Sequence, residues 1–178
     1  MVEQDKKIKP IKDEEEKVAK GEVKVNKIAF ETDKEFEQQI IDLARVTRVT
    51  SGGKRMRFRA CVAIGDHNGR IAMGVAKGAD VTIAVNKAKT QAKKHLITVT
   101  MRKNTIPHEV HEKFGAARII LKPAPLGTGI IAGGAVRIIL ELAGVKDVVG
   151  KILGSKSKIN NVKATINALS RLKKISNQ

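Results

Sequence analysis

Side chains alternate strictly along residues 54–64, and this alternation limits the possible folds more than any other feature. In an extended strand, successive side chains point to opposite faces. The apolar face would carry Met56, Phe58, Ala60, Val62 and Ile64, and the opposite face would carry Arg55, Arg57 and Arg59. The next residues, Asp66–Gly69, contain Asn-Gly, a strong hairpin-turn signal, and Arg70–Ala76 continues as a second strand. The sequence therefore predicts an antiparallel hairpin with one apolar and one cationic face.

The segment before this hairpin has two parts. Thr32 and Glu35 occupy the positions of a helix-capping box, and Phe36, Ile40 and Leu43 follow at helical spacing. We expect a short helix here, or an extended lead-in that packs on a sheet. The residues from 44 to 49 are rich in β-branched side chains and end at a Ser-Gly-Gly turn, which predicts a strand.

A helix is predicted after the hairpin, because Asp80 can cap its N-terminus and apolar residues recur at helical spacing. These residues are Val81, Ala84, Val85, Ala88, Ala92 and Leu96. A short strand, Ile97–Met101, would close this half. The first half therefore reads as three antiparallel strands with a helix on one face, a two-layer α+β sandwich.

The second half predicts another α+β unit. Its expected elements are a connector at 102–107, a strand at 118–122, a Pro-Gly-rich loop at 123–129, a helix at 134–143 ended by Gly144, a strand at 145–153 and a helix at 159–172. We divide the chain into a charged, disordered extension (1–30), a first domain (31–101) and a C-terminal domain (102–175).

The charge of the chain indicates a polyanionic partner. The sequence has 35 Lys and Arg against 18 Asp and Glu, a net charge of +17, and residues 45–178 alone carry +20. Nucleic acid is the first candidate partner and an anionic membrane surface the second. With four Phe and neither Tyr nor Trp, the chain has few platforms for base stacking, so we expect it to bind RNA through backbone and shape.

The row Arg55, Arg57 and Arg59 is the first candidate binding surface. A solvated sheet face is the alternative, but exposed strands usually mix charge signs, and this row repels itself unless an anion lies over it. An RNA backbone would supply that anion.

A glycine-rich loop gives the only signal for an enzyme. Gly127, Gly129 and Ala132 fit the loose dinucleotide fingerprint, and Asp147 lies where a ribose-binding carboxylate would stand. We reject this interpretation, because Pro123 and Pro125 separate the strand from the glycines. The loop lacks the Lys-Ser or Lys-Thr of a phosphate-binding loop as well. What remains is a loop with free N–H groups before a helix, where a phosphate of RNA could bind.

No other catalytic or metal site is predicted. Cys61 is a lone cysteine, and His108 and His111 lack the spacing of a zinc protease. Those histidines fit a strand or a loop. No apolar run approaches the ~20 residues that span a bilayer. We expect no cofactor, no metal, no membrane span and no enzymatic activity.

Several short motifs, taken together in order, indicate one particular protein family. In the first half they are Gly52–Lys54, Phe58, Ala60, Gly65, Asp66, Asn68–Arg70, Gly74 and Lys77. In the second half they are Thr105–His108, Pro123, Ala124, Gly127–Arg137, Glu141–Val145, Gly154, Ser155, Ile159, Asn160, Ala164 and Thr165. In order and spacing, the chain resembles the bacterial small-subunit ribosomal protein five family over about residues 35–173.

The resemblance implies a first domain like a double-stranded-RNA-binding domain and a C-terminal α+β domain with a left-handed βαβ unit. It implies a structural constituent of the small ribosomal subunit, in the cytoplasm, that supports subunit assembly and translational accuracy. The implied partners are small-subunit ribosomal RNA near the decoding region, ribosomal proteins four and eight, and messenger RNA at the entry channel.

The resemblance and the charge pattern together give the candidate site residues. The RNA-binding candidates are Arg45, Arg48, Lys54, Arg55, Arg57, Arg59, Asn68, Arg70, Lys77 and Thr128. Val46, Thr47 and Arg48 correspond to the family's segment near the spectinomycin site. Gly129 and Arg137 correspond to positions linked in the family to decoding accuracy, at the interface with protein four.

The chain departs from the family's usual pattern at four places. Lys158 replaces a usual Pro, Lys163 a usual Arg and Met73 a usual Phe, and Gly78–Thr82 replaces a segment that usually ends in Glu-Val-Pro. These changes affect the predicted starts of the helices near residues 81 and 159.

Overall fold

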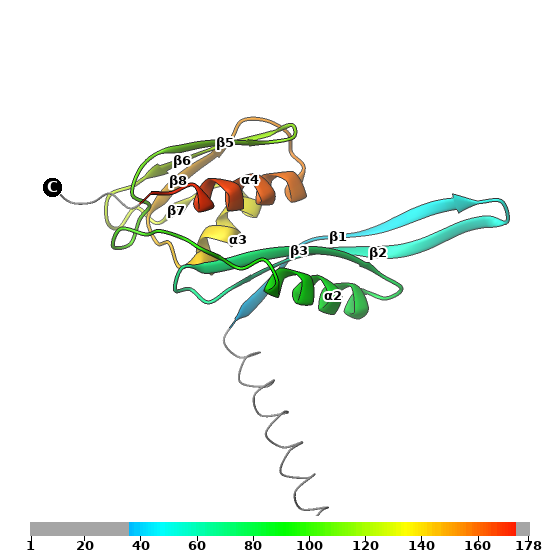
Figure 1. The fold of residues 1–178 in the computed structure, drawn as a ribbon. Helices are drawn as coiled ribbons and strands as arrows, with labels where there is room; N and C mark the ends of the chain where they lie inside the picture. Colours follow the sequence, from blue (N-terminus) through cyan, green and yellow to red (C-terminus); the bar gives the residue numbers. More distant parts are fainter. Residues whose placement is uncertain (1–35, 174–178) are drawn as a thin grey trace, which may run out of the picture. The chain divides into compact units, whose positions relative to one another are not determined.

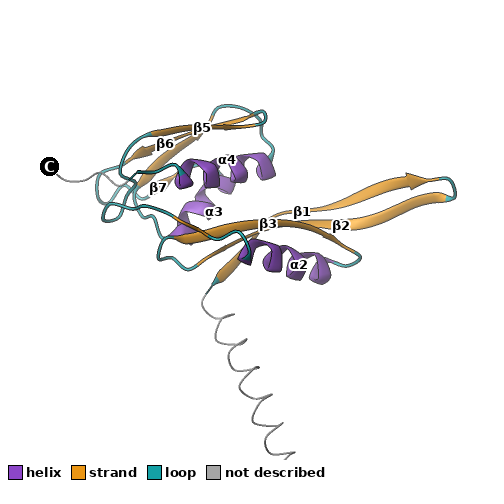
Figure 2. Ribbon diagram, viewed as in Figure 1, coloured by secondary structure: helices purple, strands orange, loops and turns teal. Residues whose placement is uncertain are grey.

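The computed structural model describes residues 36–173, so the predicted disordered extension and the Thr32–Glu35 capping box lie outside the described residues. Two four-stranded sheets and three helices make up this part of the chain (Figures 1 and 2). The elements are β1 (Glu37–Thr50), β2 (Gly53–Gly65), β3 (Arg70–Gly78), α2 (Val81–Lys93), β4 (Ile97–Thr98), β5 (Val110–Phe114), β6 (Ala117–Pro123), β7 (Ile130–Ile131), α3 (Gly134–Ala143), β8 (Val148–Ile152) and α4 (Lys158–Ser170).

The first sheet confirms the predicted antiparallel strands and their helix. Its order is β1-β2-β3-β4, and the short β4 adds a fourth strand at the edge of β3. Helix α2 packs on the face of Ala60 and Val62, and it does so closely, because a Cβ at Gly74 would collide with the Ala88 carbonyl. Asp80 is the residue that caps α2, although its side chain makes no capping hydrogen bond.

The segment from Glu37 is extended, so the helical spacing of Phe36, Ile40 and Leu43 was misleading and the extended alternative is confirmed. β1 pairs with β2 along its whole length, and the register shifts between Ile40 and Asp42. This β-bulge contains Ile41, which is buried. A bulge adds one residue and breaks the two-residue alternation, which explains why the apolar residues of a strand followed a helical pattern.

The second half contains the predicted helices and strands and two further strands. Its sheet has the order β5-β6-β8-β7, in which only β7 and β8 run parallel. The short β7 was missed, and β5 shows that His111 lies in a strand. β7, α3 and β8 form a βαβ unit as predicted, and the handedness of this connection stays a prediction.

Helices α3 and α4 lie between the two sheets and cover the face of the first sheet opposite α2. Cys61, Ala63 and Ile71 point to that side and belong to one apolar core with Ile139, Leu140 and other residues of the second half. The arginine face of β2 therefore does not continue as an open surface. Beyond Arg59, it becomes a buried contact between the two halves.

The turn between β2 and β3 caps the C-terminus of α3. The N–H groups of His67 and Gly69 donate to the carbonyls of Leu142 and Ala143, at 3.0 and 2.9 Å. The His67 ring lies 2.8 Å from the Glu141 carbonyl through Nδ1. The Leu142 and Ala143 carbonyls, which a helix end leaves unpaired, are thus satisfied by the other half of the molecule. The Glu141 carbonyl also accepts from the Gly144 amide.

Candidate nucleic-acid interface

The basic candidates of the first half gather on the outer part of the β1–β2 hairpin. β3 pairs with β2 only from Phe58 inward, so no third strand of the described residues lies beside residues 45–57. This segment, which we call the outer hairpin, extends beyond β3 and α2 (Figure 1). Both of its faces are open to solvent, and Met56, on the predicted apolar face, has half of its surface exposed (50%).

Cations occupy both faces of the outer hairpin. Arg48 lies directly opposite Arg55, and Arg57 follows on the same face, opposite Val46. Arg45 and Lys54 lie on the other face, where Thr47 stands opposite Met56. These five cations are exposed and no carboxylate among residues 36–173 pairs with them. Like charges directly opposite on a sheet are unfavourable without an intervening anion.

Arg59 differs from the rest of its row. Its guanidinium donates to the Asp42 carboxylate at 3.3 Å, and that carboxylate also lies 3.5 Å from the Lys158 ammonium of α4. Sequence reasoning missed this cluster around Asp42, since neither Asp42 nor Lys158 lies near Arg59 in the chain. Lys77, opposite Arg59 on β3, is exposed. Arg59 therefore marks the inner boundary of the open cationic surface.

The Asn68 and Arg70 candidates belong to the turn at the other end of β2. Asn68 is exposed, whereas the Arg70 Nε donates to the Asp66 carboxylate at 2.6 Å. Burial by itself would raise the pKa of Asp66, but the hydrogen bonds from Arg70 and from the Asn68 and Arg70 amides lower it overall. The structure thus places this pair at the far end of β2 from the outer hairpin.

The His67 ring joins three elements. Its Nε2 lies 2.6 Å from the Glu37 carboxylate of β1, and its Nδ1 faces the Glu141 carbonyl of α3. Both ring nitrogens therefore face acceptors, which only the doubly protonated imidazolium satisfies. The hydrogen bond to Glu37, opposed in part by burial and aided by the Glu141 carbonyl, raises the pKa of His67.

The glycine-rich loop is already occupied by a carboxylate of the chain, which corrects the expectation of free N–H groups there. The Gly127 and Gly129 amides donate to the same Asp147 oxygen, at 3.1 and 3.0 Å, and Asp147 is buried. Both glycines have positive φ, which suits residues without a Cβ. The Thr128 hydroxyl donates to the Pro125 carbonyl at 2.8 Å. Asp147 is therefore a structural residue that holds this loop.

Gly129 and Arg137 lie in the same loop-helix unit. Arg137 is in the first turn of α3, is exposed, and forms no ion pair with another described residue. Helix α3 begins after Gly133, which offers no side-chain cap. The Arg137 guanidinium is thus accessible to a partner near this helix end, and its proposed role stays a prediction.

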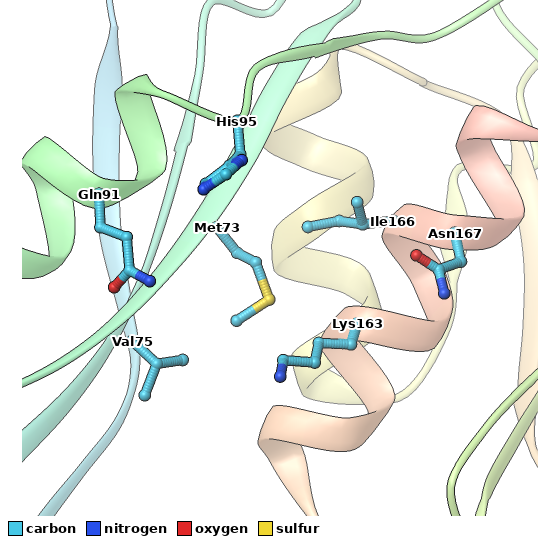
Figure 3. A pocket seen from close by; sticks show the side chains of 7 residues that line it. All are labelled: Met73, Val75, Gln91, His95, Lys163, Ile166 and Asn167. Carbon is cyan, nitrogen blue, oxygen red and sulfur yellow. The ribbon is translucent and has the colours of Figure 1, made fainter.

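A cavity of about 340 Å³ lies between β3, the end of α2 and α4 (Figure 3). It is lined by Met73 and Val75 from β3, Gln91 from α2, His95 just after the end of α2, and Lys163, Ile166 and Asn167 from α4. The Lys163 ammonium also lies 5.1 Å from the centre of the Phe114 ring. None of the predicted site residues lines this cavity.

The Cys61 thiol is chemically unreactive. Burial, and after it the Asp42 carboxylate, raises the pKa of Cys61 to about 11, which keeps the thiol protonated and unreactive. Within residues 36–173, no three His, Cys, Asp or Glu side chains gather closely enough to hold a metal ion. No helix in the same range has both the length and the apolar character needed to cross a membrane.

Comparison with known proteins identifies the family. Residues 36–100 match the family model for ribosomal protein S5, N-terminal domain, and residues 112–178 match ribosomal protein S5, C-terminal domain. Small ribosomal subunit protein uS5c of Emiliania huxleyi is 49% identical over 140 residues, covering 78% of this chain and 88% of that protein. Small ribosomal subunit protein uS5 of Gloeobacter violaceus is 52% identical over 143 residues, covering 80% of this chain and 64% of that protein. The chain therefore belongs to the ribosomal protein S5 family, whose members are structural proteins of the small ribosomal subunit and not enzymes.

Proposed function

We propose that this chain binds small-subunit ribosomal RNA through the outer hairpin, near the decoding region and the messenger entry channel. The observation that carries the proposal is the Arg48–Arg55 pair, in which two guanidinium groups stand opposite each other without a carboxylate among the described residues. A phosphate between them would replace repulsion by two attractive contacts. With Arg45, Lys54 and Arg57, the hairpin offers cations on both faces to a folded RNA.

The kind of RNA follows from the side chains that the outer hairpin lacks. Residues 45–57 contain no aromatic side chain, so bases have no platform to stack on. Arginine forks instead match phosphate oxygens. Binding is therefore driven by the backbone and shape of structured RNA and depends strongly on salt.

Two segments of the chain have more specific roles in this proposal. Val46, Thr47 and Arg48, which lie on the β1 side of the outer hairpin, would be the segment near the spectinomycin site. Gly129 and Arg137 would belong to an interface with ribosomal protein four that tunes decoding accuracy. Ribosomal protein eight and messenger RNA at the entry channel complete the proposed neighbours, and subunit assembly depends on these contacts together.

The central experiment replaces Arg48, Arg55 and Arg57 together by Gln. Arg59 is left intact because its ion pair with Asp42 gives it a structural role. Binding to a folded small-subunit ribosomal RNA fragment is measured across salt concentration, and the loss of about three phosphate contacts lowers the log–log salt slope by roughly 2 to 3. A charge-matched control replaces Lys87, Lys94 and Lys146 by Gln, all three of which are exposed elsewhere.

Normal affinity and slope in the hairpin variant would refute the proposed interface. An equal loss in the control variant would show that net charge alone matters. Circular dichroism and the urea midpoint, both expected to be unchanged, check that the hairpin variant is folded.

A second experiment addresses accuracy. Arg137→Leu leaves the protein folded and incorporated into subunits, because the side chain is exposed, but is expected to raise misreading in a reporter assay. Normal fidelity with normal incorporation would contradict the proposed role of Arg137.

A further inference from the structure

The second sheet has one covered face and one open face. Helices α3 and α4 cover the face that carries Ile119, Leu121 and Val148, all buried. The opposite face is uncovered within residues 36–173. It carries His111, Lys113, Arg118, Ile120, Lys122, Val149 and Lys151, the residues that alternate with the buried ones on β5, β6 and β8. None of these residues entered the predicted binding site.

Cations dominate this open face, and their arrangement repeats that of the outer hairpin. Lys113 lies directly opposite Arg118, as Arg48 lies opposite Arg55. Lys151 lies opposite Ile120 on the neighbouring strand. No carboxylate among the described residues pairs with Lys113, Arg118 or Lys151, and all three side chains are exposed. Within residues 36–173, this like-charged pair also lacks a counter-ion.

One acid stands at the edge of the face. The Glu109 carboxylate lies 3.1 Å from the Lys122 ammonium and 2.8 Å from His111 Nε2. The hydrogen bond from Lys122, followed by that from His111, lowers the pKa of Glu109. Glu109 therefore stays charged and neutralises one corner of the face, while the Lys113–Arg118 corner stays positive.

We infer that this open face of the second sheet binds the backbone of a second RNA segment, separate from the one at the outer hairpin. The inference rests on the proposed RNA-binding function and extends it to the second half. A protein partner fits less well, because lysine is depleted at protein–protein interfaces and three of the four cations here are lysines. Lysine ammonium groups suit phosphates as point charges.

The two surfaces cannot share one RNA contact. Helices α3 and α4 lie between the sheets, so the open face of the second sheet points away from the first sheet. The outer hairpin extends from the first sheet. The chain would thus bridge two RNA segments and hold them at a fixed separation.

The test uses the full chain and in vitro transcribed small-subunit ribosomal RNA. Lys113, Arg118 and Lys151 are replaced together by Gln, with the Lys87, Lys94 and Lys146 variant as the charge-matched control. The sheet variant is expected to lose about tenfold or more in affinity at moderate salt and to lower the salt slope by roughly 2 to 3. Glu109→Gln is expected to change the affinity for RNA in the opposite direction. It should raise the affinity roughly twofold, since it removes a charge that repels RNA.

The outcomes separate this inference from the proposed function. If the hairpin variant loses affinity but the sheet variant and Glu109→Gln bind as wild type, the second contact is overturned and the hairpin interface stands. If the sheet variant binds RNA normally but enters reconstituted subunits poorly, the face contacts a protein and the inference is overturned. If neither variant changes RNA binding, both proposals fail. Should the triple variant not fold, Glu109→Gln and Lys151→Gln alone decide the matter.

Discussion

The inner and outer parts of the β1–β2 hairpin belong to the same pair of strands but lie in opposite environments. In β2, every residue from Ala60 to Gly65 is buried, on both faces, whereas Gly53–Arg57 is exposed on both faces. The inner part lies between α2 on one side and α3 and α4 on the other. In the described part of the chain, no third strand pairs with the outer part. Strand pairing is therefore continuous along the hairpin, and the neighbouring elements decide whether a face becomes core or binding surface.

Glycines test the comparison most strongly, because the two parts tolerate a methyl group differently. A Cβ at Gly65 would collide with the Leu142 backbone, whereas one at Gly52 would meet nothing within 4 Å. Gly65→Ala is expected to cost about 3 kcal/mol or more, and Gly52→Ala less than about 0.5 kcal/mol. Urea unfolding measures both. Equal effects would show that the inner part is not closely packed.

Asp66 tests the turn at the inner end. Its buried carboxylate accepts hydrogen bonds from the Asn68 and Arg70 amides, each at 2.9 Å, and from the Arg70 side chain. Asp66→Ala leaves these donors without their acceptor and is expected to cost about 1–3 kcal/mol. The same urea assay measures it, with Asp80→Ala as control, because the Asp80 side chain makes no capping bond. A control loss as large as that of Asp66→Ala would contradict this account.

His67 makes the inner end sensitive to pH. Its pKa is raised above the ordinary 6.5, chiefly by Glu37. The stabilisation is therefore fully present below the unfolded-state pKa and is lost as pH rises through the raised folded-state pKa. Because the side chain is half exposed, we expect a contribution below about 1 kcal/mol. As pH rises through this window, the unfolding midpoint of the wild type should fall, whereas that of His67→Gln should change less. Parallel curves for the two proteins would contradict this role of His67.

A substitution of Arg48 has the smallest expected effect on stability. The direction of this effect distinguishes the outer part of the hairpin from the inner part. Arg48→Glu places an opposite charge across from Arg55, so it should stabilise the outer hairpin by a few tenths of a kcal/mol. The same change should weaken RNA binding, because a cation is replaced by an anion. A more stable variant that binds RNA more weakly would show that binding, not folding, requires this pair of cations. A less stable variant would contradict it.

Much of the fold could be predicted because local signals were strong. Asn68 and Gly69 fixed the hairpin turn, and Gly144, with positive φ, ends α3 where it was expected. The unusual residues Val81 and Lys158 stand at the starts of α2 and α4, close to the predicted positions. The two-residue β7 was missed because so short a strand carries no periodicity.

The site could be predicted only as a set of residue types. The row of arginines on β2 was evident, but the opposition of Arg48 and Arg55 depends on the register of two strands. The partners of Arg59 and the glycine loop, Asp42 and Asp147, are fixed by tertiary contacts. The open face of the second sheet was not predicted, because the sequence around His111 fits either a strand or a loop. Without β5, Lys113 and Arg118 have no common face.

The capping of α3 by the β2–β3 turn has a consequence for how the chain reaches its folded state. The His67 ring and the Glu141 carbonyl are 74 residues apart in sequence, so their contact closes a long loop and raises the contact order. During synthesis the β2–β3 turn is made before α3. The last carbonyls of α3 therefore stay unpaired until the two halves of the chain come into contact. We expect the two halves to unfold in a single cooperative transition, and a fragment beginning at residue 102 to lose helical signal at the end of α3.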